Sequence, residues 1–476
     1  MKTSILSLGL YSCLGITEAE VTHALRHGIP AITTSPERTA YGYRSPLTTS
    51  LPQPTPPYTN LHPIFQSLTR AQRARLTPLT AMALHAAAEA LSALDITTPP
   101  SDMALIVSCD STCEPQALTH SQMQANHRTA CLGPHRVFQT LNSTVSMTLA
   151  EILHFSGLTL TVSAACAGGG HAIGLAHTLI QSGIIRSALV VGAQENGLHA
   201  YTAFDALGVF ATPKPDTPTS SIPYLSRPFS THHCGLVPSG GAAALLLSSL
   251  SVSSGQSGNS GQPLATIEAY GFSTSPNIIT PSSESILASI LSALNKIPTH
   301  PYTTLPNPTK TLQRITHIVP HATATIDGDN AEAAALATLF PKEKTATVLG
   351  DSVAEPPIPT PGISCLSGQS LHYLLPLKSL TGHECWMSGV SQLAYILLQK
   401  KHNFLAPVPN ETATVLGSFA AEPQKSAPTY SPLPQISHLP IPTTPNIPFS
   451  TPSRPSDLIL LNAFGFGGTN STLIIS

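Results

Sequence analysis

Three pairs of similar segments recur in the same order along the two halves of the chain. "ALIVSCDST" resembles "THIVPHATA", "GLAHTLIQ" resembles "QLAYILLQ", and "GGAAALLL" resembles "GGTNSTLII". The offset between matched residues grows slowly, from 212 between Val107 and Val319 to 227 between Gly240 and Gly467. Each match is weak alone, but collinear repeats favour two related halves that pack together.

Short β-rich runs alternate with helical ones, as where "MALIVSC" follows "TAMALHAAAEALSAL". This alternation predicts an α/β fold with a mainly parallel sheet covered by helices. We expect a first half over 1–250, a Ser/Gly-rich flexible connection over 251–264, and a second half over 265–476. A Pro-rich stretch at about 406–457 is expected to be a surface insertion in the second half.

The composition and charge of the chain give no support for a nucleic-acid-binding or membrane-spanning protein. The formal charge of -2 gives no electrostatic argument for nucleic-acid binding, and no apolar run is long enough to span a membrane. The apolar start, "MKTSILSLGLYSCLG", is expected to be a first strand and not a signal peptide. The eight cysteines form no CxxC pair, which favours reduced thiols and a cytoplasmic location.

One cysteine lies in unusual surroundings, in "TVSAACAGGGHAIGLAHTLIQSG" at 161–183. Cys166 is expected to open a helix, where free N–H groups and the helix dipole lower a thiol pKa. His383 is expected to open the matching helix of the second half, and His321 follows the strand that matches "ALIVSC". If the halves are related by a pseudo-twofold axis, these residues converge. A buried structural cysteine before a Gly-rich turn is the alternative.

Four further motifs carry a family resemblance: "SRPFSTHHCGLVPSGGAAALLL", "HIVPHATATIDGDNAEAAAL", "LKSLTGHECWMSG" and "NAFGFGGTNSTLII". With the Cys166 motif, they resemble the β-ketoacyl-acyl-carrier-protein synthases of the thiolase superfamily, in family order and from the first strand to the last. The resemblance implies thiolase-like duplicated α/β halves in a layered α-β-α-β-α architecture. It implies no cofactor, and no spacing suggests a metal site.

The resemblance also assigns roles to individual residues. Cys166 would accept the acyl group, His321 and His383 would serve the malonyl site, and Lys378 would lie behind them. Lys378 would pair with Glu332, which lies in the same motif as Asp329. Thr323 and Thr325 would contact the pantetheine arm. The backbone N–H groups of Cys166 and Phe464 would form the oxyanion hole, and the Phe464 side chain would be the gate between the acyl pocket and the malonyl site.

The chain departs from the family pattern at several positions. Gly240 stands in place of an acidic residue and His233-Cys234 in place of Arg-Asp, so we expect a usual network of charges to be absent. Trp386, the only tryptophan, replaces a small residue three positions after His383. We expect its ring to restrict the acyl pocket or the packing around the malonyl site; the alternative is that it packs outward.

The resemblance implies acyl carrier protein as the partner that delivers acyl and malonyl groups, and a homodimer or a heterodimer with another ketosynthase-like subunit. Arg70, Arg73 and Arg75 lie in the region that would meet the acidic carrier; a solvated helix face is the alternative. Two other functions stay open: a non-catalytic partner similar to a chain-length factor, and a CoA-dependent thiolase. Retention of the thiol argues against the first, and Phe464, where thiolases have a second cysteine, argues against the second.

Overall fold

The computed structural model describes residues 2–249, 262–300, 303–306, 308–341, 372–408, 432–445, 447–449 and 457–476. Its centre is a ten-stranded sheet with the order β12-β11-β13-β14-β8-β1-β7-β6-β4-β5. In the described part of the chain no helix is long and apolar enough to cross a membrane.

The sheet consists of two five-stranded halves with the same plan. The first half contains β1 (Thr3–Tyr11), β4 (Met103–Ser108), β5 (Thr159–Val162), β6 (Ser187–Gln194) and β7 (Gly241–Ser248). The second contains β8 (Ala265–Thr274), β11 (Ile315–Val319), β12 (Tyr373–Leu374), β13 (Leu458–Phe464) and β14 (Thr469–Ile475). The halves join where β1 pairs with β8, and β4 and β11 occupy equivalent places in them. The duplication predicted from the repeats is therefore confirmed.

The expectation of a mainly parallel sheet is wrong. Five of its nine strand pairings are antiparallel. The reason is clearest at the C-terminus, where the short Gly465–Gly468 turn joins β13 to β14, because strands joined by so short a turn can only run antiparallel. Parallel pairing is confined to the three outer strands of each half.

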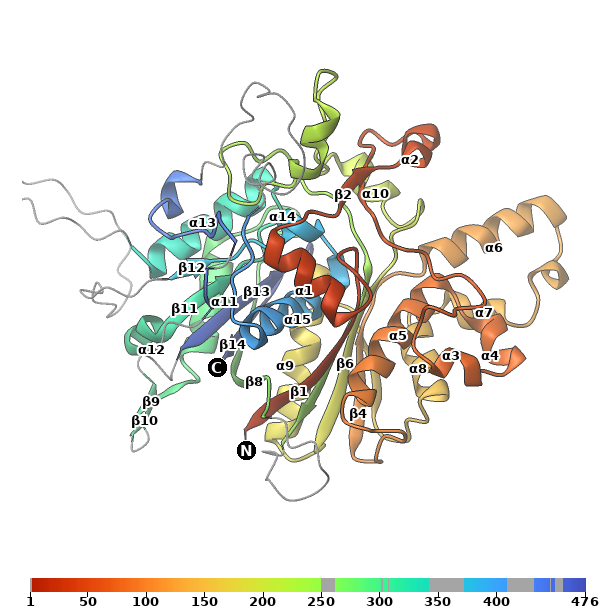
Figure 1. Ribbon diagram of the computed structural model, residues 1–476, viewed down its shortest axis with the longest axis horizontal. Helices are drawn as coiled ribbons and strands as arrows, with labels where there is room; N and C mark the ends of the chain where they lie inside the picture. The colour runs from red at the N-terminus through yellow and green to blue at the C-terminus, as the bar shows by residue number, and fades with distance from the viewer. Residues whose placement is uncertain are drawn as a thin grey trace, which may run out of the picture.

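Helices form three layers around the two half-sheets (Figure 1). On the outer faces, α5 (Pro78–Ser92) and α8 (Thr144–Ile152) cover the first half, and α11 (Ser283–Leu294) and α13 (Ile326–Leu339) cover the second. Between the halves lie α9 (Gly168–Gln181) and α15 (Ser388–Lys401), each of which contacts strands of both. The predicted layered α-β-α-β-α architecture is confirmed.

Local sequence explains why these elements form. Helix α5 begins at Pro78, which supplies no N–H where the helix would leave one unpaired, and Thr77 caps it through a hydrogen bond from Thr80 N. Its Ala-rich body lies almost wholly in the core. Strands β6 and β7 are buried along their whole length because helices cover both of their faces, which explains their continuous apolar sequences.

The remaining elements are shorter or peripheral. They are α1 (Glu18–His27), α2 (Pro36–Tyr41), α3 (Ile64–Ser67), α4 (Arg70–Arg75), α6 (Cys113–Asn126), α7 (Arg136–Thr140), α10 (Thr202–Leu207), α12 (Pro308–Arg314), α14 (Lys378–Thr381), β2 (Ile32–Thr34), β3 (Leu47–Thr49), β9 (Pro298–His300) and β10 (Thr303–Pro306). Most of the predicted connection at 251–264, and residues 409–431, 446 and 450–456 of the Pro-rich stretch, lie outside the described residues.

The two central helices touch backbone to backbone at their first turns. A Cβ atom built on Gly169 of α9 would lie only 2.9 Å from the backbone nitrogen of Gly389 of α15. Ordinary side chains would therefore force the helices apart. The small residues after Cys166 therefore serve this contact between the two halves.

Candidate active site

Cys166 lies in a short turn, η2 (Ala165–Ala167), that leads from β5 into α9. Asp110 holds the turn by accepting a hydrogen bond from Ala165 N at 3.0 Å. The position just before a helix exposes the thiol to the positive end of the helix dipole. A hydrogen bond from the Cys385 thiol, together with attraction to His383, outweighs burial and holds the pKa of the Cys166 thiol well below its usual value. These surroundings favour a thiolate.

The matching turn of the second half, η4 (Cys385–Met387), precedes α15. Both turn and helix lie 220 residues after their counterparts, so the structural counterpart of Cys166 is Trp386. The expectation that His383 opens the matching helix is therefore wrong: His383 lies before η4, in the loop after α14. The sequence match between Gln181 and Gln399 has an offset of 218, so it aligned the two halves two residues away from the structural offset of 220.

His383 contacts the thiol directly. Its Nε2 lies 3.1 Å from the Cys166 Sγ, and its Nδ1 lies 3.3 Å from Ser388 Oγ. The backbone of His383 is fixed by hydrogen bonds, since its N–H donates to Val237 O at 2.7 Å and its carbonyl accepts from Ser239 N at 3.1 Å. The imidazole is thus held against the sulfur from the side of the second half.

His321 completes the group. It follows β11, and its ring centroid lies 5.2 Å from that of His383 and 5.5 Å from that of Phe464. Burial and the nearby positive charge of Lys378 hold the pKa of His321 well below its usual value, so the ring is neutral near pH 7. Its Nδ1 is buried without a hydrogen-bond partner in the described part of the chain.

Lys378 and Glu332 both hold the backbone around His321; their opposite charges attract, but no direct hydrogen bond joins the two side chains in the described part of the chain. The Lys378 ammonium group donates to the carbonyl of His321 and, at 3.1 Å, to Gln392 Oε1. Glu332 accepts hydrogen bonds from the backbone N–H groups of His321 and Ala322 at 3.0 and 2.8 Å. Burial lowers the pKa of Lys378 to about 8 and raises that of Glu332 to about 7.

Asp329 stabilises the same loop from within α13. Its Oδ1 accepts from Ala324 N at 3.0 Å, and its Oδ2 lies 3.3 Å from Nδ1 of His233. We expected the family's usual network of charges to be absent at His233-Cys234, but the contact between His233 and Asp329 keeps one polar interaction there. A Cβ atom on Gly240 would lie 2.7 Å from the carbonyl oxygen of Gln194, so an acidic side chain has no room there.

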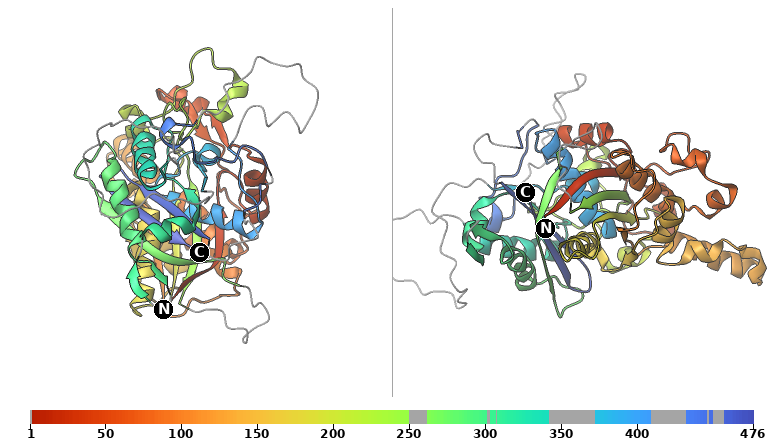
Figure 2. Two further views of the ribbon diagram at one scale, coloured as in Figure 1. Left: turned by 90° about the vertical axis from the view of Figure 1, so that its left-hand side faces the viewer. Right: turned by 90° about the horizontal axis from the view of Figure 1, so that it is seen from below.

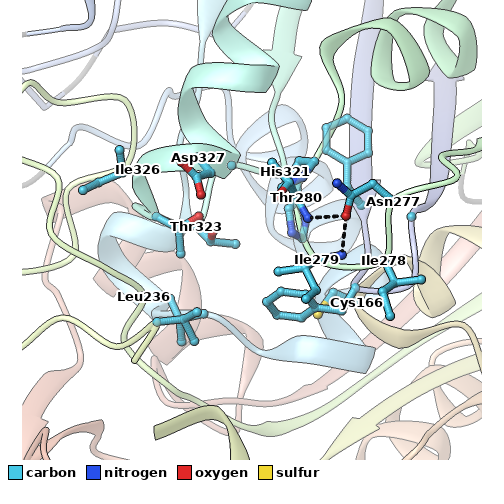
Figure 3. Close-up of a pocket in the computed structure, with 18 of the residues that line it drawn as sticks. Cys166, Leu236, Asn277, Ile278, Ile279, Thr280, His321, Thr323, Ile326 and Asp327 are labelled. Carbon is cyan, nitrogen blue, oxygen red and sulfur yellow. Dashed lines mark hydrogen bonds between the residues drawn. The ribbon is translucent and has the colours of Figure 1, made fainter. Parts of the chain in front are cut away.

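A cavity of about 370 Å³ leads to the Cys166 thiol. Figure 3 shows Cys166 on one side of this cavity, below Ile278 and Ile279, with Leu236 and Thr323 across from it. The structure also places His321, Thr325, His383 and Phe464 on the cavity wall. Asn277 braces the loop between β8 and α11 by accepting from the backbone N–H groups of Ile279 and Thr280 at 2.9 and 3.0 Å.

Trp386 lies beside Cys166 but does not line this cavity. It is partly buried and packs against the apolar cluster that contains Cys166 and Cys385, with its ring 6.2 Å from Phe204, which in turn lies 6.0 Å from Phe466. The indole Nε1 is buried without a hydrogen-bond partner among the described residues. The ring thus packs against the residues around the nucleophile, outside the cavity.

The three arginines lie far from the cavity in the same chain. Figures 1 and 2 both place α4 at the opposite end of the molecule from α13, whose first residues line the cavity. Arg75 is ion-paired with Glu151 of α8, whereas Arg73 is exposed and donates to the carbonyl of Gln66. Arg70 is exposed. Of the three, Arg70 and Arg73 present most of their charge to solvent.

Sequence reasoning missed two buried polar groups beside His383. Glu384 accepts hydrogen bonds from Ser391 Oγ at 2.5 Å and Tyr395 Oη at 2.7 Å, and burial raises its pKa to about 7. The Cys385 Sγ lies within 4.8 Å of the Cys166 Sγ. Their position directly after His383 was the available signal. Cys166, His383 and Cys385 are also the only His, Cys, Asp or Glu side chains in the described chain whose arrangement is compact enough to hold a metal ion.

Comparison with known proteins gives the same family for the whole chain. Residues 2–253, just over half of the chain, match the model of the β-ketoacyl synthase N-terminal domain. The chain is 26% identical over 478 residues to the 3-oxoacyl-[acyl-carrier-protein] synthase 1 of Escherichia coli strain K12, covering 100% of this chain and 99% of that protein.

Solved structures agree on the fold. A β-ketoacyl synthase from Burkholderia phymatum STM815 superposes with a TM-score of 0.74 at 20% identity, covering 100% of this chain and 98% of the other. The ishigamide ketosynthase/chain length factor gives a TM-score of 0.74 at 19% identity, with the same coverage.

Proposed function

The chain belongs to the β-ketoacyl synthase family, and we propose that it catalyses a decarboxylative Claisen condensation between an acyl group on Cys166 and malonyl-acyl carrier protein. The contact of 3.1 Å between the Cys166 thiol and His383 Nε2, at the end of a cavity, carries this proposal. The name of the full-length Escherichia coli relative supports acyl carrier protein as the source of the substrates.

The first half-reaction loads the enzyme. The Cys166 thiolate attacks the carbonyl carbon of an acyl thioester, the carrier's thiolate leaves and takes up a proton, and the acyl group stays on sulfur. The tetrahedral intermediate carries a negative oxygen that needs fixed donors. We assign these to the backbone N–H groups of Cys166 and Phe464. Thr323 and Thr325 line the cavity where the pantetheine arm would enter.

The second half-reaction forms the carbon–carbon bond. Malonyl thioester loses CO₂, and the electron pair left behind is delocalised onto the thioester oxygen, where His321 and His383 donate hydrogen bonds. The resulting carbanion attacks the acyl carbon, and the Cys166 thiolate leaves. The depressed pKa of His321 supports this role because a neutral imidazole can donate without protonating the carbanion. Lys378 and Glu332 position His321 through its backbone.

The competing assignment is a non-catalytic partner subunit. One of the similar solved structures is named as a ketosynthase/chain length factor, so this chain could correspond to either kind of subunit. The buried thiol–imidazole contact favours catalysis, because a silent partner has no need of it. A thiolase would condense two acyl-CoA molecules without releasing CO₂. The same assay run with this chain alone tests its partner. Condensation without any other subunit would fit a homodimer, whereas activity only after a second ketosynthase-like subunit is added would indicate a heterodimer.

The test follows the two half-reactions separately. Incubation with a panel of acyl-acyl carrier proteins should add one acyl mass to the intact protein, lost in Cys166→Ala and kept in the control Cys131→Ser. Malonyl-acyl carrier protein should then release CO₂ and yield a ketoacyl product.

His321→Ala and His383→Ala should slow CO₂ release by on the order of 10²-fold or more while Cys166 still becomes acylated. Equal loss of both half-reactions in a folded variant would overturn the division of roles. A folded wild-type chain that never becomes acylated would favour the silent partner.

A further inference from the structure

A second thiol lies beside the proposed nucleophile. The Sγ atoms of Cys166 and Cys385 and one nitrogen of His383 all lie within 4.8 Å of one another. Both thiols are buried, with exposed fractions of 2% and 1%. The catalytic steps above use Cys166 and His383 but give Cys385 no covalent role.

The duplicated architecture fixes this arrangement. Cys385 occupies the place in η4 that Ala165 occupies in η2, and both adopt positive φ angles, 41° and 46°. Side chains other than glycine rarely adopt this conformation, which persists only where the surrounding structure holds it. Here the packing of α9 against α15 holds the two turns together. The thiols therefore face each other across the junction of the two halves.

We propose that Cys166 and Cys385 form a reversible disulfide when the protein meets a peroxide. The two sulfurs need to close from at most 4.8 Å to about 2.05 Å. Side-chain rotation in the two turns supplies this movement without separating α9 from α15. The disulfide removes the nucleophile, and this consequence for activity rests on the function proposed above; the bond itself does not.

The chemistry balances in two steps. The Cys166 thiolate attacks one peroxide oxygen, the O–O bond breaks, and the products are a sulfenic acid and hydroxide. The Cys385 sulfur then displaces the hydroxyl group, which leaves as water with the Cys385 proton. Overall, two thiols lose two electrons and hydrogen peroxide becomes two waters. A dithiol reductant reverses the bond and is itself oxidised to a disulfide.

The order of these steps follows from the cavity. Cys166 lies on the cavity wall and Cys385 does not, so a peroxide that enters meets Cys166 first. Burial and the neighbouring Cys166 raise the pKa of the Cys385 thiol well above its usual value, so it stays protonated and unreactive toward peroxide. Cys385 thus resolves the sulfenic acid from behind, which protects Cys166 from further, irreversible oxidation.

The experiment follows mass and not activity. Full-length protein treated with a small excess of hydrogen peroxide should lose about 2 Da, and peptide mapping without reductant should join the Cys166 and Cys385 peptides. Dithiothreitol should restore the original mass. Cys385→Ser should instead gain about 32 or 48 Da at Cys166 and resist dithiothreitol, whereas the control Cys131→Ser should behave as the wild type.

Two results would overturn the proposal. One is a wild-type Cys166 that accumulates sulfinic acid while Cys385 remains a free thiol. The other is a disulfide that joins Cys166 to a different cysteine. If Cys385→Ser does not fold, the wild type alone decides. After peroxide treatment Cys166 should no longer react with iodoacetamide and its peptide should be joined to that of Cys385, and dithiothreitol should restore both the labelling and the separate peptides. Failure of acylation in the functional assay leaves these mass readings unaffected, so the two proposals fail separately.

Discussion

Replacement of Glu384 by glutamine tests the electrostatics directly behind His383 and Cys166. Glu384 is fully buried, and burial raises its pKa from 4.5 to about 7, against the opposing effects of the hydrogen bonds from Ser391 and Tyr395. The folded protein therefore holds this proton more tightly than the unfolded chain. This contribution to stability is fully present below about pH 4.5 and is lost as the pH rises through about 7.

The size of the effect follows from the shift. A difference of about 2.5 pKa units, at 1.36 kcal/mol for each, corresponds to about 3 kcal/mol in the free energy of unfolding. A glutamine side chain has the shape of the protonated acid but no proton to lose. We therefore expect Glu384→Gln to change stability little at about pH 4.5 and to become more stable than the wild type, by up to about 3 kcal/mol, by about pH 8.

Urea unfolding of wild type and Glu384→Gln at several pH values between about 4.5 and 8 measures this difference. Glu89→Gln, at an exposed position of α5, is the matched control and should show no such pH-dependent gain. Parallel stability curves for wild type and Glu384→Gln would refute the reasoning. They would mean that Glu384 stays ionised across the range, balanced by the nearby charge of Lys378.

Three further outcomes are expected. Iodoacetamide should label Cys166 well before Cys109, because burial raises the pKa of the Cys109 thiol to about 12, and peptide mapping of a time course checks this order. Trp386→Ala should broaden the acyl chain lengths accepted while costing a few kcal/mol of stability, so an unchanged chain-length profile would leave the indole a purely structural role. Neutralising Arg70 and Arg73 together should raise KM for acyl carrier protein but not for a pantetheine-sized thioester, and an unchanged KM at low salt would assign both to a solvated surface.

The sequence was sufficient for the plan of the fold because the repeats record it. Val107 and Val319 lie on equivalent strands, β4 and β11, and the matched apolar runs became β7 and β14. Whether neighbouring strands run parallel or antiparallel was harder to predict. The alternation of helical and β-rich runs does not show the relative direction of two strands that are connected by a long segment. The segment from Glu195 to Gly240, which separates the antiparallel strands β6 and β7, hides that pairing from any local pattern.

Side-chain partners inside the site were harder to predict for a physical reason. Lys378 was expected to pair with Glu332, yet both bind the backbone around His321 from different sides. Motif spacing places residues on one loop but does not say whether a buried charge meets another charge or a peptide group. A buried polar group needs only a complete set of hydrogen bonds, and backbone groups supply it as well as an ion pair.

The two turns at the molecular centre show how a duplicated fold separates geometry from chemistry. η2 and η4 share their length, their positive φ angle and their position before a central helix, yet the middle residue is Cys166 in one and Trp386 in the other. Close packing of α9 and α15 requires this geometry from both halves, because neither helix can shift without opening the contact at Gly169. The side chain at the middle position is not constrained in this way. One turn can therefore carry a reactive thiol while its counterpart carries an apolar ring beside it, and the first position of the second turn is free to place Cys385 against that thiol.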